Sequence, residues 1–172
     1  MAVSLLSCTN ETASGKGESL GEGAQSSGVV GSDNARIGQE WAIALPVIQN
    51  ISDSEIKVTK ARVDHVPEGL EVLEYTAYNR YDTEGVALLS YAGAPGMPDF
   101  EKFRNYAGSP ISVKSNSESD IYYVVKVKVT GRIEGSMEGA TFSYRSEGRL
   151  YEQSLPFEAA LKLTENAKSP AA

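Results

Sequence analysis

Few residues of this chain are of the types that carry nucleophilic, acid–base or soft-metal chemistry. The 172 residues include one cysteine, Cys8, one histidine, His65, and three methionines. A nucleophilic side chain needs a base beside it, but Asp64 and His65 fall on opposite faces of a predicted strand and cannot form a dyad directly. Soft metals need several Cys, His or Met ligands. We therefore expect no enzymatic activity, no metal site and no cofactor.

The long connection over residues 91–106, YAGAPGMPDFEKFRNY, is the strongest candidate for a binding surface. Asp99 is placed to cap a short helical segment near residues 99–106. Long loops in β-proteins are commonly functional or covering, and aromatic and Arg side chains favour recognition surfaces. Aromatic side chains also fill cores, so the interpretation we favour is that Phe100 and Phe103 plug the open end of the fold. A binding site would first be sought in this cluster: Tyr91, Phe100, Phe103, Arg104 and Tyr106.

Carboxylates are frequent in and near this connection, with Asp82 and Glu84 in one predicted loop and Asp99 and Glu101 in another. Calcium needs several closely placed oxygen ligands, and the spacing of an EF-hand is not present. A solvated acidic face is the interpretation we favour, and a weak surface calcium site is the alternative.

The cysteine follows a short apolar run at the start of the chain. The four residues Leu5-Leu6-Ser7-Cys8 resemble the lipobox of bacterial lipoproteins, which has Leu three residues before the Cys and a small residue just before it. Leu6 departs from the usual small residue of that motif. The resemblance implies that Cys8 is the first residue of the mature protein and carries a diacylglyceryl group, which supplies the two chains that stable anchoring needs. A cytosolic protein with an incidental Cys8 is the alternative.

The apolar stretch before Cys8 is shorter than that of a complete secretory signal. We therefore expect residues 1–8 to be the remnant of a signal peptide and the natural chain to begin upstream. Residues 9–36 are rich in Gly and Ser and lack aromatic residues, a composition that predicts a flexible tether with a reach of about 30 Å. Such a tether fits the lipoprotein resemblance, which implies an extracytoplasmic domain on the bacterial cell membrane.

From residue 37 to residue 166 the sequence predicts an all-β domain. Short alternating apolar runs are separated by turn signals, as in antiparallel sandwiches, and we expect seven to nine strands of an immunoglobulin-like β-sandwich. The alternation changes phase near Thr59-Lys60, which predicts a β-bulge. We expect strand 121–133 to pair with strand 140–145, and residues 167–172 to be disordered. The other predicted strands are 40–49, 55–66, 70–79, 86–91, 150–155 and 157–163.

Charge and hydropathy limit the kinds of partner. The formal net charge is -7, which disfavours nucleic acid and favours a soluble monomer. No apolar run approaches the roughly 18 residues that span a bilayer, so the expected membrane link is the lipid on Cys8.

The sequence therefore predicts a non-catalytic binding or scaffolding domain at the cell envelope, with an envelope protein, a peptide or a glycan as partner. The first alternative is a small-ligand or ion-binding accessory protein of an envelope transport system. The second is a cytosolic interaction protein. A sizeable pocket under the 91–106 connection would favour the first alternative.

Overall fold

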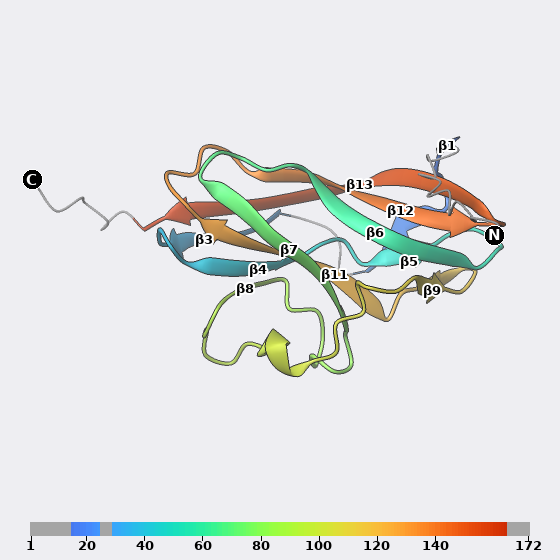
Figure 1. Cartoon of the computed structure of the whole chain (residues 1–172), viewed down its shortest axis with the longest axis horizontal. Helices are drawn as coiled ribbons and strands as arrows, with labels where there is room; N and C mark the ends of the chain where they lie inside the picture. The colour runs from blue at the N-terminus through green and yellow to red at the C-terminus, as the bar shows by residue number, and fades with distance from the viewer. Residues whose placement is uncertain (1–14, 25–28, 165–172) are drawn as a thin grey trace, which may run out of the picture.

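The structure is a computed structural model that describes residues 15–24 and 29–164 (Figure 1). The described chain is nearly all β, which confirms the predicted fold class, with sandwich-like layers of mainly antiparallel sheets. It has thirteen strands where seven to nine were predicted, because several are only two or three residues long. The predicted helical segment is confirmed as one turn of 3-10 helix, η1 (Phe100–Lys102).

Two larger sheets and one small sheet form the layers. The six-stranded sheet has the order β1-β13-β12-β6-β9, with β3 also paired to β13, and the four-stranded sheet has the order β7-β11-β4-β8. The small sheet has the order β10-β5-β2. The strands of the six-stranded sheet are β1 (Gly15–Lys16), β3 (Val29–Ala35), β6 (Ile56–His65), β9 (Ile111–Val113), β12 (Met137–Ser146) and β13 (Arg149–Leu163). Those of the other two sheets are β7 (Leu70–Asn79), β11 (Ile121–Val129), β4 (Glu40–Ala44), β8 (Leu89–Tyr91), β10 (Ser117–Glu118), β5 (Ile48–Asn50) and β2 (Leu20–Glu22).

Strand β11 begins where predicted but ends at Val129 instead of Ile133, and its predicted partner is wrong. It pairs with β4 and β7 in the four-stranded sheet, whereas β12 pairs with β6 and β13 in the six-stranded sheet. The chain therefore crosses from one layer to the other between β11 and β12 instead of closing a hairpin. The two predicted strands 150–155 and 157–163 are one continuous strand, β13, and the predicted strand 40–49 is interrupted at Pro46 into β4 and β5.

The predicted bulge in β6 is confirmed. Lys60 lies opposite Ser143 of β12, while Val58 lies opposite the next residue, Tyr144. Thr59 is thus the extra residue that changes the phase of the alternation. The bulge lets both halves of β6 turn their apolar residues, among them Val58 and Val63, toward the same core.

The prediction of a flexible tether over residues 9–36 is wrong for the described residues of that range. Strands β1 and β3 add to β13 in parallel, and β2 adds to β5. Leu20 is buried, and the Gln153 side chain accepts a hydrogen bond from the Leu20 N–H at 2.9 Å and donates one to the Leu20 carbonyl at 2.7 Å. The predicted signal remnant 1–8 and the predicted disordered residues 167–172 lie outside the described residues.

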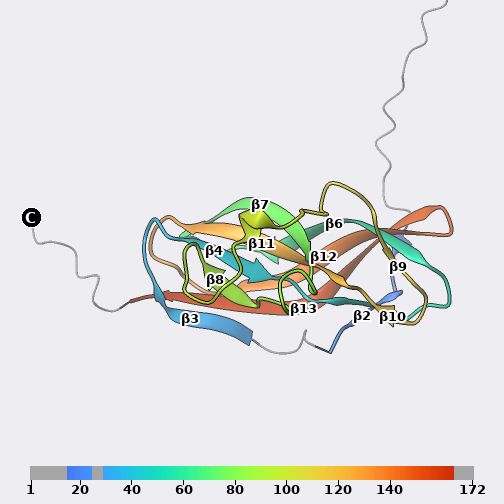
Figure 2. The same ribbon diagram turned by 90° about the horizontal axis from the view of Figure 1, so that it is seen from below.

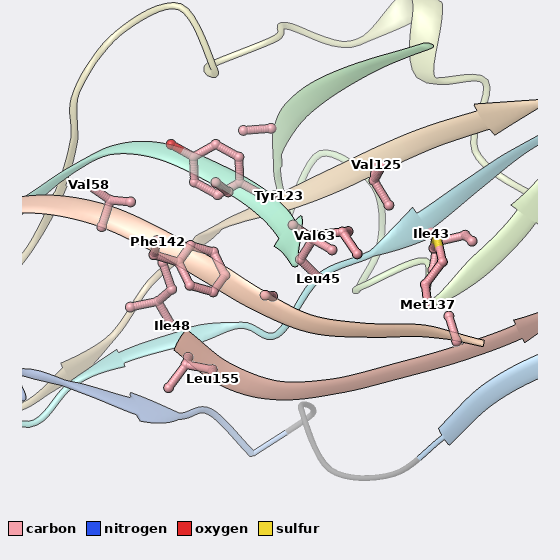
Figure 3. Close-up of a cluster of buried hydrophobic side chains, with 14 of the residues drawn as sticks. Ile43, Leu45, Ile48, Val58, Val63, Tyr123, Val125, Met137, Phe142 and Leu155 are labelled. Atoms are coloured by element: carbon pink, nitrogen blue, oxygen red, sulfur yellow. The ribbon is translucent and has the colours of Figure 1, made fainter. Parts of the chain in front are cut away.

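The main core lies between the two larger sheets (Figure 3). Tyr123 and Val125 of β11 face Phe142 of β12, and the ring centroids of Tyr123 and Phe142 are 6.1 Å apart. The odd-numbered apolar residues of β11 all belong to this core, as the period-two pattern predicts. The hydroxyl of Tyr123 has no hydrogen-bond partner among the described residues.

The two larger sheets differ in their outer faces. The outer face of the six-stranded sheet carries polar side chains such as Asp64, which accepts hydrogen bonds from Thr141 and Ser154, each at 2.6 Å. The outer face of the four-stranded sheet carries the buried residues Tyr122 and Val124. A buried outer face needs a cover, and the residues between β8 and β9 supply it.

Candidate functional site

The connection from β8 to β9 folds over the outer face of the four-stranded sheet. In Figure 1 it lies, with η1, on the side of β4 and β8 away from β12 and β13, and in the view of Figure 2 η1 lies over β7 and β11. Phe100 of η1 packs on Tyr78 of β7, with ring centroids 4.7 Å apart, and Phe103 joins the same small cluster. The small side chains of Ala42 and Ala44 on β4 leave room for this second layer.

The far end of the connection is fixed to the edge of β7. Ala77 donates its N–H to the Asn105 side chain at 3.0 Å and accepts a hydrogen bond from the N–H of Tyr106 at 2.8 Å. The Tyr106 side chain packs against the main core. The Arg104 guanidinium lies over the Tyr106 ring, 4.7 Å from its centroid. These contacts make residues 105–106 an anchor of the loop.

A pocket of about 430 Å³ remains between the near end of the connection and the sheet. Its volume lies within the range of small-ligand sites in proteins, about 300–1,000 Å³. Its floor is formed by residues of β4, β8 and β11, and its other wall by residues 92–101. The lining residues are Glu40, Trp41, Ala42, Ser90, Tyr91, Ala92, Gly93, Ala94, Met97, Pro98, Asp99, Phe100, Glu101 and Lys126.

The backbone of the pocket's loop wall depends on two glycines. Gly93 and Gly96 have φ values of +80° and +73°, and no atom lies within 4 Å of where a Cβ would be. Positive φ is the reason for glycine at these two positions. Between them, Pro95 restricts its own φ. The chain of this wall therefore turns sharply at Gly93 and at Gly96, and the backbone of Pro95 between them is restricted.

Two of the five predicted aromatic and Arg residues line the pocket, namely Tyr91 and Phe100. The other three, Phe103, Arg104 and Tyr106, hold the loop in place instead. The prediction that Phe100 and Phe103 plug the open end of the sandwich is corrected, because they cover the outer face of one sheet. Cys8 lies outside the described residues.

The predicted cap at Asp99 is only partly right. Asp99 occupies the N-cap position of η1, but its side chain makes no capping hydrogen bond. Its carboxylate pairs instead with the Lys102 ammonium at 3.1 Å. The carboxylate therefore lies at the rim of the pocket with its charge matched by a neighbour on the same turn.

Sequence reasoning missed the strand residues of the pocket, above all Glu40, Ala42, Ser90 and Lys126. Ala42 lies opposite Lys126 on one side and Ser90 on the other, so these three share one row of the outer face. The sequence does carry a signal for this row. On the outer face of β11 the apolar pair Tyr122 and Val124 is followed by Lys126, which marks where the covered surface ends.

The Lys126 ammonium is held by carboxylates. It donates to the Glu74 carboxylate at 2.7 Å and is 24% exposed. Burial by itself lowers the pKa of Lys126, but the hydrogen bond to Glu74 and the charges of nearby groups, Glu101 among them, outweigh burial and raise this pKa. The electrostatic environment at the pocket floor therefore favours positive charge.

The pocket contains carboxylates and one lysine but no serine–histidine or cysteine–histidine pair, and His65 lies opposite Glu138 in the other sheet. Among the described residues no three Asp, Glu, His or Cys side chains gather closely enough to hold a metal ion.

Comparisons with protein-family models, with curated proteins and with solved structures found no match. The lipobox resemblance and the immunoglobulin-like topology therefore stay predictions. Within the described residues, no helix is long and apolar enough to cross a membrane.

Proposed function

We propose that this protein is a non-catalytic binding domain whose ligand occupies the pocket between residues 92–101 and the outer face of the four-stranded sheet. The observation that carries the proposal is the pocket itself, which has a defined volume and is lined by both charged and aromatic residues. Tyr91 is 37% exposed and Met97 is 40% exposed, so each offers apolar surface to a ligand. Of the functions predicted from sequence, the small-ligand-binding alternative is the one this geometry favours.

The domain acts, in this proposal, as a receptor held at the cell envelope by a lipid on Cys8. A membrane-held receptor raises the local concentration of its ligand or partner beside that membrane. The test is the mass of the protein expressed from its own gene in its native host. A detergent-extracted species that begins at Cys8 and is heavier by a diacylglyceryl group supports the anchor, whereas a soluble species with a free thiol contradicts it.

Ligand binding should be visible through Trp41, the single tryptophan of the chain. Trp41 is among the residues that line the pocket, but it is 4% exposed in the main core, and its ring packs edge-on against Tyr91 with centroids 5.4 Å apart. We expect at least one member of a panel of amino acids, amines, short peptides and oligosaccharides to change the Trp41 fluorescence in a saturable way. A panel that leaves the fluorescence and the thermal midpoint unchanged throughout would count against a ligand-binding role.

Replacing Tyr91 with Ala should weaken binding of any such ligand about tenfold, because an aromatic anchor at a binding site is commonly worth more than 1 kcal/mol. The measurement is the dissociation constant by calorimetry. The matched control is Tyr81→Ala, since Tyr81 is 70% exposed and does not line the pocket. Equal losses of affinity in the two variants would place the ligand elsewhere.

A further inference from the structure

The charged and aromatic residues that line the pocket together indicate which chemical class of ligand it takes. We propose that the ligand is an organic cation, with an ammonium or guanidinium group carried on an apolar stem. This inference rests on the proposed function, because it assumes that the pocket between residues 92–101 and the sheet is the binding site.

Two carboxylates of the pocket are available for a ligand. Glu40 lies on the outer face of β4, and Glu101 lies on η1 across the pocket. Both are exposed, and neither forms an ion pair with a described residue within 4.0 Å. A cation between them would interact with two carboxylates that come from different elements of the fold.

The other charges of the pocket are already matched. The Asp99 carboxylate pairs with Lys102, and the Lys126 ammonium pairs with Glu74 at 2.7 Å. After this pairing Glu40 and Glu101 are the two pocket carboxylates without an ion pair to a described residue within 4.0 Å, although Lys128 lies opposite Glu40 in the register and Glu101 interacts with Lys126 through its charge. An anionic ligand would have to overcome those two charges as well as the protein's net charge of -7.

The aromatic and aliphatic lining residues suit such a ligand, because aromatic rings attract its charged end and aliphatic side chains contact its stem. Tyr91 on the edge strand β8 is 37% exposed and its ring packs edge-on against Trp41, and aromatic faces attract ammonium and guanidinium groups. Met97 adds a flexible, polarizable side chain on the loop wall, and Ala42 leaves space on the floor. The absence of a metal-binding group of side chains among the described residues favours an organic cation over a metal ion.

A series of probes with one stem and three charges tests the proposal. Hexylammonium, hexanol and hexanoate share a six-carbon stem and differ in charge. We expect hexylammonium to bind about tenfold more tightly than hexanol, from contacts with two carboxylates and one aromatic face, and hexanoate to bind least. Titrations followed by the backbone amide resonances of residues 90–101 locate the binding and measure its affinity. The preference should weaken as salt is added.

The variant Glu40→Gln/Glu101→Gln should bring the affinity for hexylammonium to that for hexanol. Its matched control is Glu55→Gln/Glu68→Gln, which changes the net charge equally at two exposed positions outside the pocket and should keep the preference. Cadaverine and the peptide acetyl-Gly-Lys-Gly-amide, run in parallel, distinguish a free amine from a lysine side chain as the source of the cation.

The outcomes separate this inference from the function it rests on. The proposal of a cationic ligand is overturned if hexanol binds in the pocket as tightly as hexylammonium. It is also overturned if the control variant loses the preference as fully as the pocket variant. In both cases the proposal of a binding pocket is kept. If neutral sugars of the wider panel bind and the amines do not, the ligand class is also overturned. If nothing in the panel perturbs residues 90–101, both proposals fall.

Discussion

Leu20→Ala should lower the free energy of unfolding by about 2–4 kcal/mol, although the composition around Leu20 is that of a flexible tether. The Leu20 side chain is 3% exposed within the main core. Strand β2 also holds the chain through the two hydrogen bonds between Leu20 and Gln153. The loss of this buried side chain would leave a cavity beside the small sheet, which chemical denaturation would register as a lower midpoint.

The matched control for Leu20 is Leu73→Ala on β7, where the side chain is 42% exposed and the expected loss is well under that at Leu20. Amide hydrogen exchange supplies a second measurement. The N–H of Gly17 donates to the Glu152 carbonyl at 2.7 Å, and that of Gly23 donates to the Val47 carbonyl at 2.8 Å, so both should be protected. Unprotected amides at Gly17 and Gly23, together with no change in the free energy of unfolding in Leu20→Ala, would support the prediction of a flexible tether instead.

The N-terminal strands show where composition stops being informative. Disorder is predicted from a segment's own apolar content, but residues 15–24 obtain much of their stabilisation from side chains far along the chain. The Tyr144 hydroxyl accepts a hydrogen bond from the Ser19 N–H at 3.1 Å. A Cβ on Gly17 would overlap the Tyr144 side chain. Gly17, which contributes to the linker-like composition of this segment, is thus required by close packing.

The strands were more predictable than their pairing, for a physical reason. Period-two alternation states which residues of a strand face the core, and it identified the buried face of β11 and the bulge at Thr59 correctly. Alternation does not state which neighbour supplies the hydrogen bonds. β11 and β12 follow one another and are both apolar on one face, yet they lie in opposite layers, because a sandwich core needs one such face from each sheet.

The candidate site was half predictable for a related reason. Residues 91–106 were identified because a long aromatic connection is unusual, and Tyr91 and Phe100 do line the pocket. The floor residues Ala42 and Lys126 belong to regular strands, where nothing local distinguishes them. They become part of a site only because the loop covers Tyr122 and Val124 and ends its cover at Lys126.

Tyr123→Phe should leave the protein as stable at neutral pH or stabilise it by about 1–2 kcal/mol, because the change removes a buried hydroxyl that has no described hydrogen-bond partner. The Tyr123 side chain is 3% exposed, and burial raises the pKa of its phenol to about 12. Fluorescence-monitored urea unfolding of both proteins at pH 7 measures the difference. A loss of more than 1 kcal/mol in the variant would mean that the hydroxyl has a partner after all.

The difference in stability between the wild type and Tyr123→Phe should be larger at alkaline pH. Below pH 10 the Tyr123 phenol is protonated in both the folded and the unfolded chain. Its ionisation therefore takes nothing from the free energy of unfolding in this range. Between pH 10 and about 12 the unfolded chain releases the proton while the folded protein retains it, so unfolding is favoured as the pH rises. Two pKa units correspond to about 3 kcal/mol. The wild type should lose that much more stability than Tyr123→Phe over this range.

The neighbouring Tyr122 is the control that separates burial from the missing hydrogen bond. Tyr122 is 1% exposed and burial raises its pKa too, but its hydroxyl lies 3.0 Å from the Thr83 hydroxyl in a hydrogen bond. Tyr122→Phe should therefore cost about 1 kcal/mol at pH 7, opposite in sign to Tyr123→Phe. If both variants lost stability equally at pH 7, the two hydroxyls would be equally satisfied, and the alkaline loss would belong to the core in general instead of to Tyr123.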